Sequence, residues 1–374
     1  MEKKWIKAYL NGKKGTKILR DVIKLDSTYY DAYLGLGLYH YYADLLPSII
    51  KFLSFITGIH GDKKKGIDEL DKAIQKSRLA SVEAKYFMAE ILLDHEKLYK
   101  KAVKILENLE NEYPENLIFS NKLAEGYKKA GLHTAALREL KSIVNTIQNK
   151  KHQYINFKSC YDYGTLLYLH NKFRQLLYFC YTLHSEMKNS SNQHHWIFPI
   201  ATYYLGECHA ILGNNDSASV YYKKILKKDH EQLFNTAQYR IKNPLKKSDI
   251  ISLKTNNYLQ LKNYIEALNY LNEILSKELT DTHNTNNNIF LLRYFIACTK
   301  FKIGNYEEAI KLFTYLIDEQ NQTQTWIKPY SHFHIAKCYK KLHNNKKAEY
   351  HYTRACESKD KKKIAMVEKS RKMK

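Results

Sequence analysis

The sequence predicts an all-α protein, built as an α-solenoid of about eight helix–turn–helix repeats. Three observations support this prediction. Turn-forming residues are scarce, with 13 Gly and 5 Pro in 374 residues, fewer than a sandwich or barrel needs. Hydrophobic residues make up 44%, enough for a continuous core. A helix–turn–helix pattern also recurs along the chain, which favours one long repeat array over two or three globular domains.

The clearest copy of the pattern is "ATYYLGECHAILGNNDSASVYYKKILKKD", from Ala201 to Asp229. Its first helix contains Gly206 in a Leu-Gly pair, and its second helix contains Ala218 and Tyr222. Small residues suit positions where two helices cross closely, and large residues fill the neighbouring space. Gly213 lies between the two helices, where a glycine can end a helix in the left-handed conformation. The segment therefore reads as two short antiparallel helices.

This pattern resembles the tetratricopeptide repeat (TPR), in which a large residue is followed by Leu-Gly, Tyr, a turn Gly, Ala and an aromatic. The resemblance covers about Tyr30 to Glu357 and implies a right-handed superhelix whose concave surface binds extended or helical peptides. Successive copies are 34 to 49 residues apart, against a family period of about 34. The equivalent second-helix positions are Gly66, Ala102, Ala136, Leu176, Ala218, Ala267, Ala309 and Ala348.

The repeats divide the chain into three parts. Residues 1–29 are expected to form an N-terminal partial repeat or cap, because Ile18 to Leu25 resembles a second helix whose first helix is poor or missing. Residues 30–357 form the TPR-like array. Residues 358–374, "SKDKKKIAMVEKSRKMK", contain eight basic and two acidic residues and are expected to form a basic C-terminal helix or tail.

One apolar run, "LLPSIIKFLSFITGI" at Leu45–Ile59, interrupts the first repeat. Pro47 suits a helix start and Gly58 a helix end, so residues 45–61 are predicted to form an inserted apolar helix. Its roughly 11 helical residues would extend about 16 Å, too short for a bilayer core of about 30 Å. The segment also resembles an insertion in larger bacterial and eukaryotic TPR proteins, which implies a structural insertion in an interaction scaffold. Asp62 is well placed to cap the following helix.

Packing of this inserted helix over the end of the solenoid is the favoured interpretation. A hydrophobic docking ridge for a partner and interfacial contact with a membrane are the alternatives.

The net charge of +23 is compatible with nucleic acid, an anionic membrane surface or an acidic protein partner. Only eight of the 61 basic residues are Arg, however, and Lys is weaker in bidentate recognition of phosphates and bases. The Lys residues are scattered over many predicted helix surfaces and cluster only in the tail. Nucleic-acid (RNA) binding by a basic helical repeat is therefore the alternative, and an acidic protein or peptide is the favoured partner.

Motifs that carry catalysis or metal binding are weak. The chain has no Gly-rich phosphate loop, nucleophile elbow or metalloprotease helix. His332, His334 and Cys338 are close in sequence, but packing within a repeat explains them better than a metal site. The six cysteines form no C-x-x-C pair, which favours a reducing compartment. We therefore predict a cytoplasmic, non-enzymatic protein without cofactor or metal.

A candidate peptide-binding groove follows from the TPR resemblance, which places the first helix of each unit along the concave surface. One residue after the leading large residue of each first helix, the copies have Leu34, Phe87, Asn121, Tyr161, Tyr203, Ser252, Tyr294 and Phe333. The five aromatic members, Phe87, Tyr161, Tyr203, Tyr294 and Phe333, are the candidate groove residues. Packing within the array is the equally weighted alternative.

The residues expected to pack the repeats are Gly37, Ala102, Ala136, Gly164, Gly206, Ala218, Ala309 and Ala348. The Lys, Asn and Arg arrangement that would clamp a chaperone C-terminus is not found, so that ligand is disfavoured. The predicted function is a non-enzymatic protein-interaction scaffold that binds a peptide or partner helix in the concave groove.

Overall fold

The computed structural model describes residues 2–46, 61–149, 157–188, 196–280, 287–319 and 325–357. Within these ranges all regular secondary structure is α-helical, which confirms the predicted fold class. The predicted inserted helix, apart from its two ends, and the whole predicted tail at 358–374 lie outside the described residues.

The chain divides into two compact units, Met1–Tyr163 and Gly164–Lys374. The boundary between them falls within a helix. The first unit contains α1 (Glu2–Leu25), α2 (Ala32–Asp44), α4 (Lys63–Lys76), α5 (Ser81–Asp94), α6 (Tyr99–Glu112), α7 (Leu117–Lys129), α8 (His133–Asn149) and the first half of α9 (Phe157–Leu169). The second unit contains the remainder of α9, α10 (Phe173–Lys188), α11 (Ile197–Ile211), α12 (Asn215–Lys223), α13 (Glu231–Lys242), α14 (Lys247–Gln260), α15 (Tyr264–Thr280), α16 (Asn287–Ile303), α17 (Tyr306–Asp318), α18 (Ile327–Lys341) and α19 (Asn345–Cys356).

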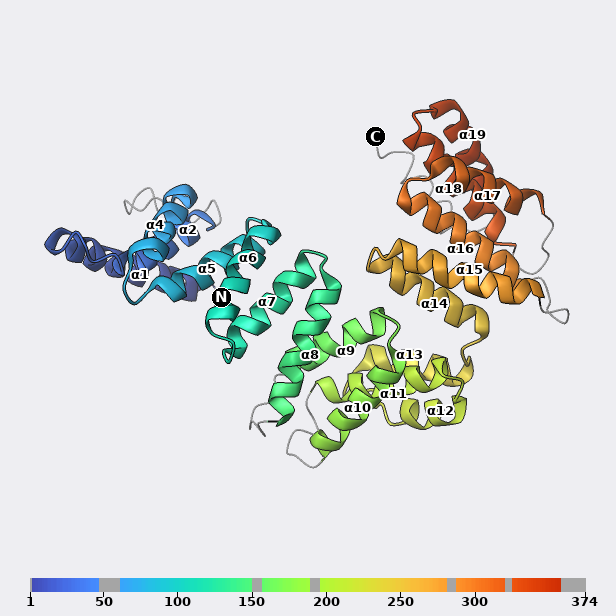
Figure 1. Ribbon diagram of the computed structural model, residues 1–374, viewed down its shortest axis with the longest axis horizontal. Coiled ribbons are helices and arrows are strands. Elements are labelled where there is room, and N and C mark those ends of the chain that lie inside the picture. The colour runs from blue at the N-terminus through green and yellow to red at the C-terminus, as the bar shows by residue number, and fades with distance from the viewer. Residues whose placement is uncertain are drawn as a thin grey trace. The chain divides into compact units, whose positions relative to one another are not determined.

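Most of these helices form TPR-like pairs that pack side by side (Figure 1). The pairs are α2 with α4, α5 with α6, α7 with α8, α9 with α10, α11 with α12, α14 with α15, α16 with α17 and α18 with α19. The eight repeat positions that begin with Gly66 and end with Ala348 each fall on the second helix of a pair. Helix α1 precedes the first pair, and α13 occupies the longest interval between two repeats. The structure is thus a TPR-like α-solenoid within each unit.

Each short turn inside a pair contains one residue in the left-handed conformation. These residues are Lys97, Gly131, Asn171, Gly213, Lys262, Gly304 and His343, with φ between 56° and 99°. Glycine was expected at this position, and three of the seven are glycines. In the α7–α8 turn the N–H of Leu132 donates to the carbonyl of Tyr127, five residues back. In the α5–α6 turn the N–H of Leu98 donates to Leu92, six residues back, so this turn has one extra residue.

Small residues allow the helices of a pair to cross closely. A Cβ on Gly66 of α4 would lie 2.8 Å from the carbonyl oxygen of Gly37 on α2. A Cβ on Gly206 would lie 2.5 Å from the ring of Tyr222, which packs from α12. The predicted cap is also present, because the carboxylate of Asp62 accepts a 2.9 Å hydrogen bond from the N–H of Lys65 at the start of α4.

Candidate partner-binding surface

The eight predicted repeat-packing residues are all buried in the structure. The five predicted groove aromatics differ more. Phe87, Tyr161 and Tyr203 are half-buried, whereas Tyr294 and Phe333 are buried. These aromatic residues have different surroundings in the two units.

In the second unit, Tyr294 and Phe333 fill the space between helices. The ring of Tyr294 lies 5.1 Å from Trp326 and 5.9 Å from Phe313. The ring of Phe333 lies 6.1 Å from Tyr352 on α19. Burial also raises the pKa of the Tyr294 phenol. These two side chains are buried among neighbouring aromatic rings, which favours the packing interpretation for them over the groove interpretation.

Tyr203 belongs to a buried polar network around Glu207, which sequence analysis did not single out. Glu207 is 1% exposed and accepts hydrogen bonds from the hydroxyl of Tyr222 at 2.7 Å and from Nε of Arg240 at 3.0 Å. The hydroxyl of Tyr168 donates to the same carboxylate at 3.4 Å. Burial, together with the Glu207 charge, raises the pKa of Tyr203 and of Tyr222. The network joins α9, α11, α12 and α13 around one charge.

Helix α14 is attached to the α9–α10 turn on the same unit. The side-chain amide of Asn257 donates to the carbonyl of Tyr168 at 2.9 Å and to Oδ1 of Asn171 at 2.8 Å. The amide of Asn171 donates in turn to the carbonyl of Lys254 at 3.1 Å. Lys254 Nζ lies 5.8 Å from the ring centre of Phe173, and burial lowers the pKa of this lysine. Helix α14 and the end of α9 therefore bond to each other, so these polar groups are already satisfied within the chain.

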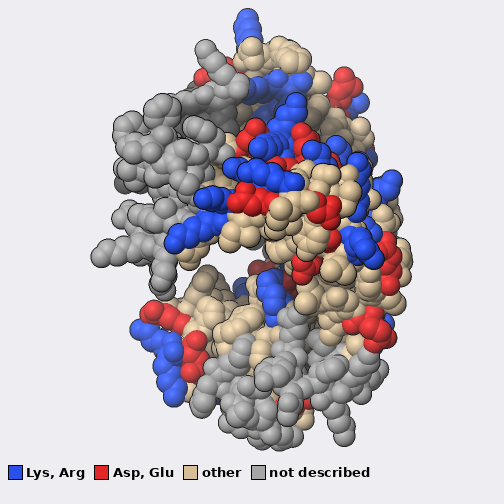
Figure 2. Space-filling view, turned by 90° about the vertical axis from the view of Figure 1, so that its left-hand side faces the viewer, with Lys and Arg blue, Asp and Glu red and all other residues tan. Residues whose placement is uncertain are grey.

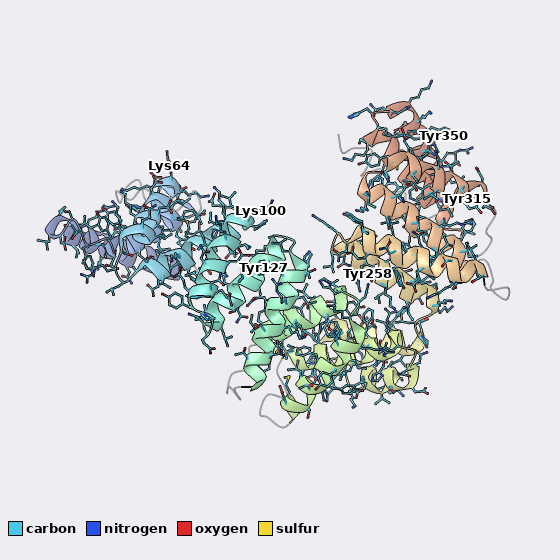
Figure 3. The ribbon with its side chains drawn as sticks, in the orientation of Figure 1. Lys64, Lys100, Tyr127, Tyr258, Tyr315 and Tyr350 are labelled. Carbon is cyan, nitrogen blue, oxygen red and sulfur yellow. The ribbon has the colours of Figure 1, made fainter. Side chains whose placement is uncertain are left out.

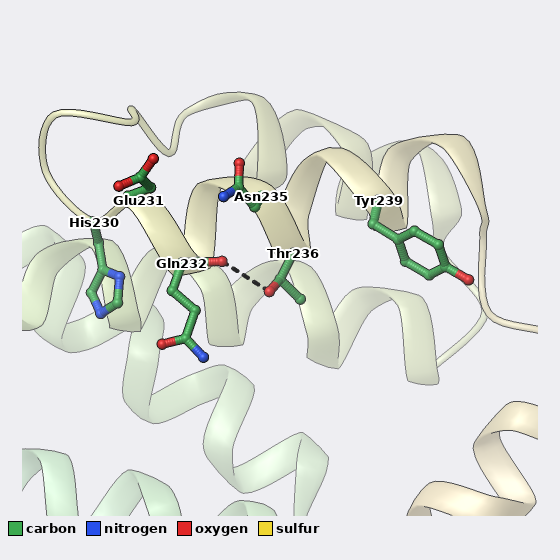
Figure 4. A pocket seen from close by; sticks show the side chains of 6 residues that line it. All are labelled: His230, Glu231, Gln232, Asn235, Thr236 and Tyr239. Carbon is green, nitrogen blue, oxygen red and sulfur yellow. Dashed lines mark hydrogen bonds between the residues drawn. The ribbon is translucent and has the colours of Figure 1, made fainter. Parts of the chain in front are cut away.

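The α13 helix borders an open hollow of about 730 Å³ on the second unit (Figure 4). Its described lining comes from this one helix and consists of His230, Glu231, Gln232, Asn235, Thr236 and Tyr239. Nδ1 of His230 accepts from the N–H of Leu233 at 3.3 Å and caps the helix. Thr236 donates to the carbonyl of Gln232 at 2.9 Å. The lining side chains project along the helix surface and do not converge on one point.

In the first unit, the extra residue in the α5–α6 turn changes the expected register. Met88 and Ala89 on α5 are buried in the positions that Leu123 and Ala124 hold on α7. Tyr86, rather than Phe87, therefore corresponds to Asn121, and the predicted position is wrong by one residue. The Tyr86 ring lies 5.9 Å from Phe119 on α7. Burial and the nearby Glu90 raise the pKa of the Tyr86 phenol.

Five charged residues of α5 and α7 form a network beside Tyr86. Nζ of Lys122 lies 3.1 Å from Glu90, 3.2 Å from Glu125 and 3.6 Å from Asp94. Lys129 pairs with Glu125 at 2.8 Å and also contacts Asp94. Burial opposes the charge of Lys122, but its three carboxylate partners raise its pKa. We call Tyr86, Glu90, Asp94, Lys122, Glu125 and Lys129 the α5–α7 face.

The polar contacts continue from α7 to α9 within the first unit. Lys128 pairs with Asp162 at 2.7 Å. The hydroxyl of Ser159 donates to Oδ1 of Asn121. Nζ of Lys158 lies 5.9 Å from the ring centre of the predicted groove residue Tyr161. Tyr161 thus lies beside the α5–α7 face, with part of its ring exposed.

The sequence cluster of His332, His334 and Cys338 does not converge. His334 is half-buried, with Nε2 3.9 Å from Sγ of Cys298, and desolvation lowers the pKa of this histidine to about 3. His332 faces His351 instead, with their Nδ1 atoms 3.0 Å apart. Among the described residues, no three His, Cys, Asp or Glu side chains are grouped to hold a metal ion. All six cysteines have free thiols.

Charged side chains are mixed on the face seen in Figure 2. Lys and Arg lie among Asp and Glu there, and the described residues of that face do not form one continuous patch of a single sign. Tyrosines are also distributed widely, as the labelled Tyr127, Tyr258, Tyr315 and Tyr350 show (Figure 3). None of the helices in the described ranges has the length and hydrophobicity needed to cross a bilayer.

Comparisons with known proteins find helical-repeat structures. No family model matches the sequence, and no curated protein matches it. The apo form of the quorum sensor NprR from B. thuringiensis is 13% identical, with a TM-score of 0.39 over 95% of this chain and 96% of that chain. A tetratricopeptide repeat protein from Parabacteroides merdae is 16% identical, with a TM-score of 0.33 over 77% and 96%. Yeast Tom70 is 14% identical, with a TM-score of 0.34 over 91% of this chain and 61% of its own.

Proposed function

We propose that this TPR-like α-solenoid is a non-enzymatic scaffold that holds a peptide or partner helix against the α5–α7 face. The observation that carries the proposal is the Lys122 network beside Tyr86. Its charged groups are paired and held on two packed helices, so little ordering is needed when a partner binds. The tyrosine supplies a large, rigid contact area next to these charges.

The partner of this face carries a Lys or Arg side chain. Lys122 is 11% exposed, whereas Glu90, Asp94 and Glu125 are 28% to 39% exposed. Lys129 is 34% exposed, so a ligand meets three partly exposed carboxylates and one partly exposed lysine, although the whole chain is strongly basic. This local reversal of charge favours a basic segment at the α5–α7 face, in contrast to the acidic partner expected from net charge.

A pull-down from native lysate at two salt concentrations tests the function. The test variant is Tyr86→Ala with Tyr161→Ala, and the matched control is Tyr178→Ala, an exposed tyrosine on α10. We expect a protein that stays bound at high salt, is lost with the test variant and is kept with the control. Capture of RNA that is released by salt and ignores Tyr86 and Tyr161 would contradict the scaffold and support the nucleic-acid alternative.

A further inference from the structure

Helix α1 has the register of a second helix, but no described helix packs on it as the first helix of a pair. Gly15 lies 22 residues before Gly37, as Ala102 lies 22 residues before Ala124. Gly37 and Ala124 hold equivalent positions on first helices, so Gly15 corresponds to Ala102 and to the other repeat positions on second helices. Helix α1 packs on α2 as α6 packs on α7, and Figure 1 shows it alongside α2.

In complete pairs, the residue three positions after the repeat position contacts the first helix of its own pair. Glu69 of α4 bonds His40 of α2. Tyr221 of α12 stacks on His209 of α11 with ring centres 5.6 Å apart. His351 of α19 meets His332 of α18. The equivalent residue on α1 is Ile18.

The side of α1 that bears Ile18 is open. Ile18 is 63% exposed and Leu25 is 90% exposed, and Val22 lies between them on the same helix face. A Cβ on Gly15 would meet no atom within 4 Å, whereas a Cβ on Gly66 would meet the backbone of α2 at 2.7 Å. We call the helix surface formed by Gly15, Ile18, Val22 and Leu25 the α1 face. It has the small glycine and the apolar side chains found where two helices of a pair pack together, but no helix among the described residues covers it.

The opposite side of α1 is already in use. Thr16 is buried, a Cβ on Gly35 of α2 would lie 2.6 Å from Leu19, and Arg20 bonds Nε2 of His40 at 3.0 Å. These contacts hold α1 in place on α2. The open face is thus presented on an anchored helix, which reduces the ordering cost of binding.

The charged side chains beside the α1 face favour one kind of binding partner over another. Lys14 and Lys17 are exposed on its solvent side, and Lys24 lies there in an ion pair with Asp21. A second copy of this basic helix would be repelled, whereas a helix with Glu or Asp beside its apolar stripe would be attracted. We propose that the α1 face binds an acidic amphipathic helix of a partner protein, which packs on α1 as a first helix packs on the second helix of a complete pair. This surface is separate from the α5–α7 face.

Two peptides from the chain's own first helices provide the probes. The α5 peptide, Ser81–Asp94, has a formal charge of −2, and the α18 peptide, Ile327–Lys341, has +4. Fluorescence anisotropy uses the full chain carrying Tyr86→Ala with Tyr161→Ala, so that the α5–α7 face does not take up the basic α18 peptide. It should show saturable binding of labelled α5 peptide and at least tenfold weaker binding of α18 peptide. Equal affinity for both peptides, or no saturable binding of the α5 peptide, would overturn the proposal.

Variants locate the binding. In Gly15→Leu the new side chain begins in open space, because a Cβ at this position meets no atom within 4 Å, but it would fill the space that a bound helix needs. Ile18→Asp places a charge among the apolar residues of the α1 face. Both should weaken α5-peptide binding at least tenfold, whereas Ile265→Asp, at a 72% exposed isoleucine on α15, should not. Tyr86→Ala with Tyr161→Ala should leave the affinity unchanged, which separates this proposal from the scaffold function. Full affinity in Ile18→Asp, or self-association that depends on Ile18, would refute it.

Discussion

Gly37 of α2 and Gly66 of α4 cross so closely that a Cβ on Gly66 would lie 2.8 Å from the Gly37 carbonyl oxygen. The other neighbours of this Cβ are the backbone N and the Cβ of Tyr41, at 2.7 and 2.9 Å. Backbone atoms cannot move aside as the end of a flexible side chain can. The first pair of the array therefore depends on two glycines at one crossing.

Gly66→Ala should consequently lower the free energy of unfolding of the first unit by about 1–3 kcal/mol, as overpacking does. Gly15→Ala, at the equivalent position on α1, should instead raise it by up to about 1 kcal/mol, because alanine favours the helix and meets no neighbour. Urea denaturation followed by circular dichroism measures both changes. Similar effects of the two substitutions would show that the α1 face around Gly15 is covered rather than open.

Arg240→Met should strongly destabilise the second unit. It leaves the carboxylate of Glu207 buried without its cation, and losing one partner of a buried ion pair costs about 3–5 kcal/mol. Arg354→Met on α19, whose exposed arginine pairs with Glu357 at 3.1 Å, should change stability little. Scanning calorimetry of the two variants provides the comparison. If they unfold at the same temperature, the Glu207 network does not stabilise the unit.

The half-buried His334, whose Nδ1 atom is enclosed, should make the stability of the second unit pH-dependent. Burial lowers its folded-state pKa to about 3, below the ordinary value of 6.5, so the unfolded chain binds the proton more tightly. The stabilisation is complete above pH 6.5 and is lost as pH falls toward 3, by at most about 1.4 kcal/mol per pH unit. His334→Gln should flatten the dependence between pH 6.5 and 4.5 in urea titrations. If the free energy of unfolding has the same slope against pH in the variant, groups other than His334 cause the pH dependence.

Lys122→Met should leave Glu90, Asp94 and Glu125 with less positive charge between them. Like charges then repel, and the first unit should lose about 1–2 kcal/mol of stability, most strongly at low ionic strength. Unfolding measured in 0.05 M and 0.5 M NaCl tests this, because salt should restore part of the loss. Lys158→Met, at an exposed lysine, is the matched control and should have little effect.

The positions of the repeats could be read from the sequence, because each depends on a local pattern of small and large residues. The residues from Gly66 to Ala348 all lie on second helices as predicted. Their turns were harder to align, since Lys97 takes a left-handed conformation without being a glycine. The extra residue in that turn moved the predicted aromatic position from Phe87 to Tyr86.

The amino-acid pattern by itself determined the helix pairs, the turn positions outside the α5–α6 turn and the Asp62 cap, because these features arise between residues that are close along the chain. Tertiary structure alone decided which aromatics are available to a partner. Tyr294 and Tyr161 occupy the same repeat position, yet one is enclosed by Trp326 and Phe313 and the other is half-exposed. Exposure is set by the residues that pack from neighbouring pairs. Contacts such as Asn257 with Tyr168, 89 residues apart, cannot be read from either local segment.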